Sequence, residues 1–236
     1  MSHLLFLRRI APVLIFAVIW LGSITVAKAD PVSFVLSGGD FSGGTNNTGG
    51  NVTVVISNIS GGVQISITNN LVDPGAFVDE LYLNTSFAPL AGASATCFSG
   101  CAAIGLTDGS LYNAGSPGAL GWQFGSDEFQ ADGDGRYDIF ADLPNDNSGG
   151  VRLDIGETVV FSVTSTTVGF DSASFLVYSA PGGGHGPFQV AAHIQGLPPD
   201  NGGSDFISQV PEPASLLLLG TGLIGIAGGV RRRLRK

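Results

Sequence analysis

Residues 52–68 read VTVVISNISGGVQISIT, and this part of the 236-residue chain is the clearest indication of its fold class. In each half of the stretch apolar side chains occupy every second position, at 52, 54 and 56 and again at 63, 65 and 67. A period of two is typical of strands with one buried face. The glycine-containing run Asn58–Gly62 separates the halves, so the stretch predicts a β-hairpin with a five-residue loop.

The chain on either side of the predicted hairpin also has the pattern of short strands and turns. Short apolar runs alternate with Gly, Asn, Asp and Ser, which are turn-forming residues, and nothing between the two chain ends has the period of a helix. The sequence therefore predicts an all-β domain over 30–196, best described as a jelly-roll-like β-sandwich. A closed sheet and a pair of smaller β-subdomains remain open alternatives. Further strands are expected at 32–36, 77–83, 120–124, 137–141, 158–166, 174–178 and 190–195.

The first 29 residues have the three parts of a secretory signal peptide. Arg8 and Arg9 precede an apolar stretch, and Ala27-Lys28-Ala29 supplies a cleavage site of the A-x-A type. We expect signal peptidase to remove residues 1–29, so they do not belong to the folded domain. An uncleaved N-terminal anchor is the alternative.

The C-terminal segment 210–236 has the layout of a membrane anchor. Ala214–Val230 contains 17 uncharged residues, about 25 Å as a helix, which is near the short end of what a hydrocarbon core requires. Five of the last six residues are Arg or Lys, and such a cluster keeps a tail cytoplasmic. The sequence predicts a transmembrane helix over 214–230, a basic cytoplasmic tail, and a linker over 197–209.

The same segment resembles a known sorting signal. Pro211-Glu212-Pro213, the apolar span and the arginine cluster occur in the order found in the PEP-CTERM signal of Gram-negative bacteria. In that family exosortase, a membrane-embedded protease, recognises the signal, and its substrates are associated with exopolysaccharide or biofilm matrix. The resemblance implies that these three residues are recognition residues and that exosortase is a partner during export.

The resemblance also implies a location. It places the protein in the cell envelope or extracellular matrix of a Gram-negative bacterium, anchored in the inner membrane at least before processing. A permanent single-pass anchor with an incidental Pro-Glu-Pro is the alternative.

Charge is distributed very unevenly along the chain. Residues 30–213 hold all 19 carboxylates and only two cations, Arg136 and Arg152, which gives this region a formal charge of −17. A domain with this charge repels nucleic acid and anionic headgroups and attracts divalent cations. We therefore expect no nucleic-acid partner. An acidic polysaccharide would need a bridging cation, whereas a neutral one would not.

The only two cysteines are Cys97 and Cys101. An exported chain meets an oxidising compartment, so a disulfide between them is the expected state. Three intervening residues that include a glycine allow the two Cα atoms to come within bridging distance. A redox pair or a metal site is the alternative.

A run of aspartates suggests a second site. Asp132, Asp134 and Asp138 are spaced so that one turn could offer several oxygens to Ca²⁺, although the stretch does not fit the EF-hand loop. The other interpretation is a solvated acidic loop whose side chains form local turns. Two pairs of carboxylates are adjacent in sequence, Asp79-Glu80 and Asp127-Glu128. In a strand the two members of such a pair should face opposite sides. This disfavours a glycosidase, which needs two carboxylates on one sugar site.

Aromatic residues supply a candidate glycan site. Trp122 is the candidate for stacking against a sugar, and Phe124, Tyr137, Phe140 and Tyr178 are further ones. Core packing is the competing interpretation for each. No catalytic set or motif is evident, so we expect no enzyme. The sequence favours an exported structural or adhesive protein linked to exopolysaccharide or biofilm, with a carbohydrate-binding module as the alternative and a hydrolase as a weaker one.

Overall fold

The computed structural model describes residues 31–38, 49–115, 119–146, 151–184, 186–198 and 201–209. The expected signal peptide, the Pro211-Glu212-Pro213 motif, the helix over 214–230 and the basic tail all lie outside these residues. Within the described ranges, none of the helices has the length and apolar character needed to cross a membrane.

The described residues confirm the predicted all-β class. Eleven strands account for most of the structure, and two short 3-10 helices connect some of them. The elements are β1 (Val32–Gly38), β2 (Gly50–Ile59), β3 (Gly62–Leu71), β4 (Phe77–Leu83), β5 (Ser94–Ser99), η1 (Cys101–Ile104), β6 (Gly121–Ala131), β7 (Asp134–Asp142), β8 (Leu153–Asp154), β9 (Thr158–Thr164), η2 (Ser172–Phe175), β10 (Val190–Leu197) and β11 (Gly203–Gln209).

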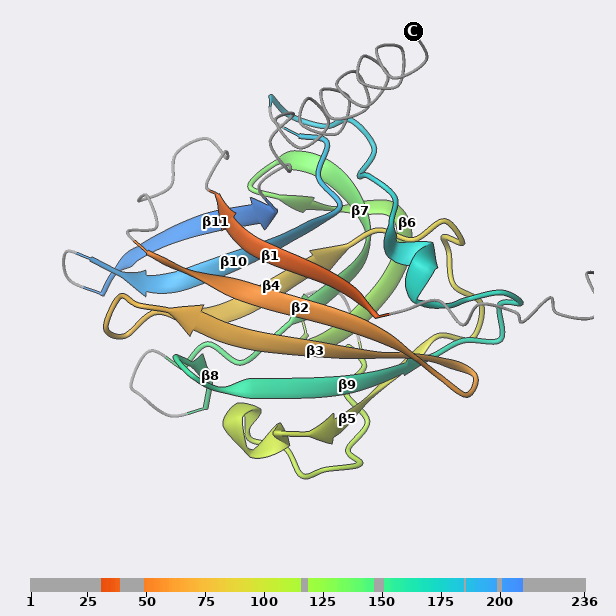
Figure 1. Ribbon diagram of the computed structural model, residues 1–236, viewed down its shortest axis with the longest axis horizontal. Helices are drawn as coiled ribbons and strands as arrows, with labels where there is room; N and C mark the ends of the chain where they lie inside the picture. The colour runs from red at the N-terminus through yellow and green to blue at the C-terminus, as the bar shows by residue number, and fades with distance from the viewer. Residues whose placement is uncertain are drawn as a thin grey trace, which may run out of the picture.

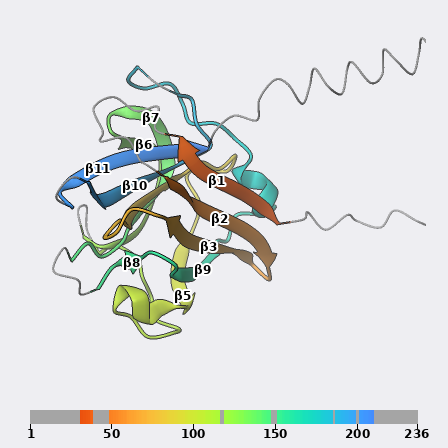
Figure 2. The ribbon, with the colours of Figure 1, turned by 60° about the vertical axis from the view of Figure 1, so that its left-hand side comes forward.

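All strands belong to one antiparallel sheet. The order is β5-β9-β3-β2-β1-β11-β10-β4-β7-β6, with the short β8 paired to β4. Figure 1 shows this sheet curling, with β6 and β7 strongly bent, and Figure 2 shows β1, β2 and β3 side by side. A twisted sheet of this many strands has to curl or split. The strands follow one continuous path rather than two packed sheets, so the predicted jelly-roll sandwich is not confirmed.

Residues 110–114 connect the two edge strands of the curled sheet. On one side Cys97 of β5 donates its backbone N–H to the carbonyl of Ser110 at 2.8 Å, and on the other Trp122 of β6 donates to the carbonyl of Tyr112 at 2.8 Å. The segment thereby uses hydrogen-bonding groups on β5 and β6 that an open edge would leave free.

The hairpin predicted over residues 52–68 is present, but its loop is shorter than predicted. Ile59 pairs with Gly62, so only Ser60 and Gly61 lie between β2 and β3. Gly61 has φ 78°, a left-handed conformation that favours glycine in a two-residue turn. Asn58 and Ile59 therefore belong to the strand.

Other differences concern where strands begin and end. Residues 203–209, expected within a linker, form β11, which pairs with both β1 and β10 in the middle of the sheet. The strand expected at 174–178 is absent, and η2 occupies part of it. Asp171 caps η2 by accepting a hydrogen bond from the Ser174 N–H at 3.1 Å, while its own N–H donates to Ser174 Oγ. This reciprocal cap stabilises a helical turn where the apolar pattern suggested a strand.

Buried apolar side chains form a main core on the enclosed face of the sheet and a smaller cluster on the other face. The main core draws on nearly every strand and includes Trp122 and Phe161. The smaller cluster contains Tyr82, Tyr137 and Phe188, with Phe206 packed against it. Because β4 and β7 contribute to both, the sheet is covered on two sides at this point, and polar groups between β4 and β10 are withdrawn from water.

Candidate functional site

The disulfide predicted between the two cysteines is present. Cys97 in β5 and Cys101 in η1 are bonded, with their Cα atoms 5.9 Å apart, and both side chains are fully buried. The bond closes a loop of only a few residues, so it fixes the local path from strand to helical turn more than it stabilises the whole domain.

Two of the three aspartates expected to bind Ca²⁺ make other contacts, and the third, Asp132, is exposed. Asp138 is 7% exposed, and its two oxygens accept the backbone N–H groups of Thr85 at 3.0 Å and Asp127 at 2.9 Å. Asp134 is also buried and accepts the Gly184 N–H at 2.5 Å. Among the described residues, no group of three His, Cys, Asp or Glu is placed to hold a metal ion. The Ca²⁺ prediction thus gains no support, and the carboxylates of Asp134 and Asp138 act as cross-links between backbone segments.

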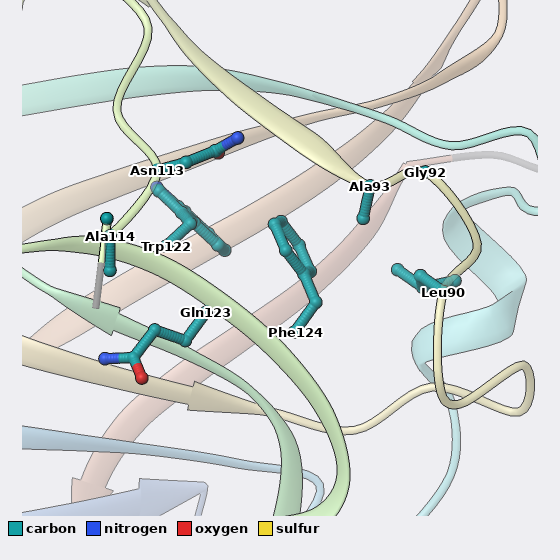
Figure 3. Close-up of a pocket in the computed structure, with 9 residues that line it drawn as sticks. Leu90, Gly92, Ala93, Asn113, Ala114, Trp122, Gln123 and Phe124 are labelled. Carbon is teal, nitrogen blue, oxygen red and sulfur yellow. The ribbon is translucent and has the colours of Figure 1, made fainter. Parts of the chain in front are cut away.

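Trp122 belongs to the core, in contrast to the glycan-stacking role considered for it. The side chain is 1% exposed and packs edge-on against Phe161, with ring centroids 5.2 Å apart, and against Phe124 at 6.4 Å. Figure 3 shows Trp122 and Phe124 on one side of β6 and the Gln123 side chain on the other. A pocket of about 490 Å³ lies beside these residues. With so little surface exposed, Trp122 cannot offer a ring face to a sugar.

A cluster of ionisable side chains that was not predicted from the sequence lies between β4 and β10. Glu80 pairs with His193 and Val78 pairs with Ile194, so the register shifts at Asp79. Such a bulge places two successive side chains on the same side of a strand. The expectation that Asp79 and Glu80 face opposite sides is therefore wrong.

The two carboxylates converge on one nitrogen. His193 Nδ1 lies 2.8 Å from Asp79 Oδ1 and 3.7 Å from Glu80 Oε2. Gln195 donates its amide to the other oxygen of Asp79, and the Tyr82 hydroxyl donates to Glu80 at 2.7 Å. The His193 ring also stacks on Phe206, with ring centroids 4.3 Å apart. We call Asp79, Glu80 and His193, with Asp142, the carboxylate–histidine cluster.

The pKa values of three groups in this cluster are raised. Burial raises the pKa of Asp142 to about 6, and the charges of Glu80 and Asp79 act in the same direction. Burial also raises the pKa of Glu80, although the hydrogen bond from Tyr82 lowers it. For His193 burial lowers the pKa, but contact with Asp79 and the charges of Asp79, Glu80 and Asp132 outweigh it, so the pKa is raised. Asp142, Glu80 and His193 therefore hold their protons more tightly than they would in the unfolded chain.

This proton affinity predicts that the domain is more stable in mild acid than in mild base. A group whose pKa is raised on folding stabilises the folded state below its unfolded pKa, and that contribution is lost as the pH rises through the folded value. The stabilising contribution of Asp142 and Glu80 is lost from about pH 4 upward, and that of His193 is lost above about pH 6.5. We expect the melting temperature at pH 5 to exceed that at pH 8 by roughly 3–8 °C.

Thermal melts of the purified protein across this pH range check the prediction. The variant Asp142→Asn cannot titrate and should show a smaller difference between pH 4 and pH 6. A melting temperature that is constant or rises from pH 5 to pH 8 would contradict the assignment of raised pKa values to these groups.

The comparisons with known proteins identify the C-terminal segment. The family model of the PEP-CTERM protein-sorting motif matches residues 209–233. Neither a curated protein nor a solved structure matches the chain. The match includes Pro211, Glu212 and Pro213 and begins at Gln209, the last residue of β11. The motif therefore follows directly on a central strand of the sheet.

Proposed function

Because the chain carries a PEP-CTERM protein-sorting motif, which implies export and sorting by an exosortase, we propose that it is a structural or adhesive protein of the cell surface or extracellular polysaccharide matrix. The observation that carries the proposal is the motif itself, which begins where β11 ends. After a cut near Pro211-Glu212-Pro213, the strands of the sheet would remain whole. The released product would be the β-domain with its disulfide.

The charge, the disulfide and the sheet edges of the domain support the same role. Its formal charge of −17 over residues 30–213 favours solubility through self-repulsion. The buried disulfide suits an oxidising compartment outside the cytosol. A sheet with its edge strands bridged by residues 110–114 also offers little free edge to other chains, which helps a secreted β-protein stay unaggregated.

Replacement of the Pro211-Glu212-Pro213 residues by alanine tests the sorting step. We expect the wild-type protein from its native host to lack both ends, by intact mass, and to co-fractionate with extracellular polysaccharide. The triple-alanine variant should accumulate as a longer species in the inner-membrane fraction, because the protease no longer recognises it.

Asp108→Ala, an exposed position far from the motif in the sequence, is the matched control and should be processed like the wild type. If the triple-alanine variant is cut and released as efficiently as the control, the motif does not direct sorting. If the wild type is processed but stays away from the matrix fraction, sorting stands and the matrix role fails.

A further inference from the structure

A polar pocket with one exposed aromatic ring lies at the junction of four chain segments. Its volume is about 290 Å³, close to the lower bound of about 300 Å³ for pockets that hold small ligands. Asn84 and Thr85 follow β4, Ser126 and Asp127 come from β6, Asp138 comes from β7, and Tyr178 lies in the segment after η2. We call these six residues the Tyr178 pocket.

The walls of the Tyr178 pocket are held in place by hydrogen bonds. The buried carboxylate of Asp138 joins two of them, since it accepts the N–H groups of Thr85 and Asp127. The wall that carries Tyr178 is fixed by the next two residues: Ser179 donates to the carbonyl of Phe188 at 2.8 Å, and Ala180 donates to the carbonyl of Arg136 at 3.1 Å. A pocket built in this way exists before any ligand arrives, so little ordering is needed on binding.

Tyr178 differs from every other tyrosine of the protein. Tyr82, Tyr112 and Tyr137 are 5%, 7% and 0% exposed, whereas Tyr178 is 60% exposed. Core packing therefore explains the first three and does not explain the fourth. An exposed ring of this kind has an apolar face and a polar hydroxyl, a combination that is suited to an amphipathic ligand.

We infer that the Tyr178 pocket binds one sugar residue of a neutral polysaccharide. The apolar C–H face of a pyranose can pack on the Tyr178 ring, while its hydroxyls can donate to the exposed Asp127 carboxylate and exchange hydrogen bonds with Ser126. The strongly acidic domain would repel a uronic acid or sulfated sugar. This inference rests on the proposed matrix function, for which it supplies the class of ligand and the residues that bind it.

A binding assay with purified exported protein tests the site. The probes are the neutral polysaccharides dextran, mannan and β-glucan and the acidic polysaccharide alginate, each with EDTA present to remove bridging cations. We expect binding to at least one neutral probe and none to alginate. Tyr178→Ala should weaken that binding about tenfold or more, because an aromatic anchor at the centre of a site carries much of the affinity.

Two further variants separate stacking from unrelated effects. Phe98→Ala removes another exposed aromatic ring, 55% exposed and outside the pocket, and should leave binding within about twofold of the wild type. Asp127→Asn keeps the size of the side chain but removes its charge, so it should weaken binding less than Tyr178→Ala does. The thermal melts of Tyr178→Ala and Phe98→Ala should match that of the wild type.

Several outcomes overturn the inference. These are binding to alginate alone, no binding to any neutral probe, or equal binding by Tyr178→Ala and the wild type. None of them bears on sorting, since the fractionation of cells tests that step separately. A protein found in the matrix fraction that binds no neutral polysaccharide would leave the proposed function standing without this site.

Discussion

Trp122→Ala is expected to lower the melting temperature of the protein by roughly 6–20 °C. The substitution removes a side chain that is 1% exposed and that packs between Phe161 and Phe124. Truncating a buried Trp or Phe to Ala costs about 3–5 kcal/mol, and each kcal/mol shifts the melting temperature of a domain of this size by about 2–4 °C. Thermal unfolding followed by near-ultraviolet circular dichroism measures the change.

The location of Trp122 extends the effect of the substitution beyond β6. Its backbone N–H donates to Tyr112 in the segment that connects the two edges of the sheet, and Tyr112 stacks on Phe161 with ring centroids 5.7 Å apart. A cavity at this place loosens the contact between β6, that segment and β9 together.

Trp122→Phe, which fills most of the volume, should recover much of the stability. Tyr178→Ala, on the surface, should change it by less than about 0.5 kcal/mol. A Trp122→Ala protein that melts within about 2 °C of the wild type would show that the indole is not part of the core.

Most of the strands could be predicted from the apolar pattern of the sequence. In β2 and β3 buried residues alternate from Val52 to Ile56 and from Val63 to Ile67. The structure pairs these strands over their whole length, from Gly50 with Leu71 to Ile59 with Gly62. The expected strand at 77–83 coincides with β4. β2 and β3 could be predicted because each has one buried face, and a buried face imposes its period on the sequence. β4 is buried on both faces, and its apolar residues indicated a strand without a clean alternation.

β11 could not be predicted by the same reasoning. Asp205 lies in this strand at 3% exposure and the neighbouring Ile207 and Ser208 are both buried, so the apolar period is lost. The sheet accepts the strand because β1 and β10 pair with it on both sides. Pairing with distant segments outweighs a weak local preference here, and a single sequence does not reveal those partners.

The candidate sites depended even more on tertiary structure. The disulfide could be predicted from the expected compartment and the cysteine spacing. Trp122 and Tyr178, in contrast, are both aromatic residues of expected strands, yet one is 1% and the other 60% exposed. The bulge that turns Asp79 and Glu80 to the same side depends on their register with His193. Neither the exposure of a ring nor the register of two strands distant in sequence is encoded in a local pattern.

Asp79→Ala is expected to reduce the free energy of unfolding by about 3–5 kcal/mol, the range for breaking a buried pair by removing one partner. Asp79 is 2% exposed and touches both His193, at 2.8 Å, and Gln195. Its loss leaves the imidazole and the amide without their acceptor in a place that water does not reach freely. Chemical denaturation monitored by tryptophan fluorescence measures the loss, and Glu80→Gln, at 3.7 Å from the same nitrogen, is the matched control with the smaller expected effect.

The titration of His193 distinguishes pairing from packing. Asp79→Asn keeps the shape of the side chain and can still accept the Gln195 amide, so it should cost less stability than Asp79→Ala. It removes the charge that raises the pKa of His193, and NMR titration of the imidazole should therefore show a lower pKa in this variant. In a His193→Gln background the cost of Asp79→Ala should shrink, because part of it is the contact between the two side chains. An unchanged His193 pKa in Asp79→Asn, together with equal costs of Asp79→Ala in both backgrounds, would show that the two groups are neighbours without being coupled.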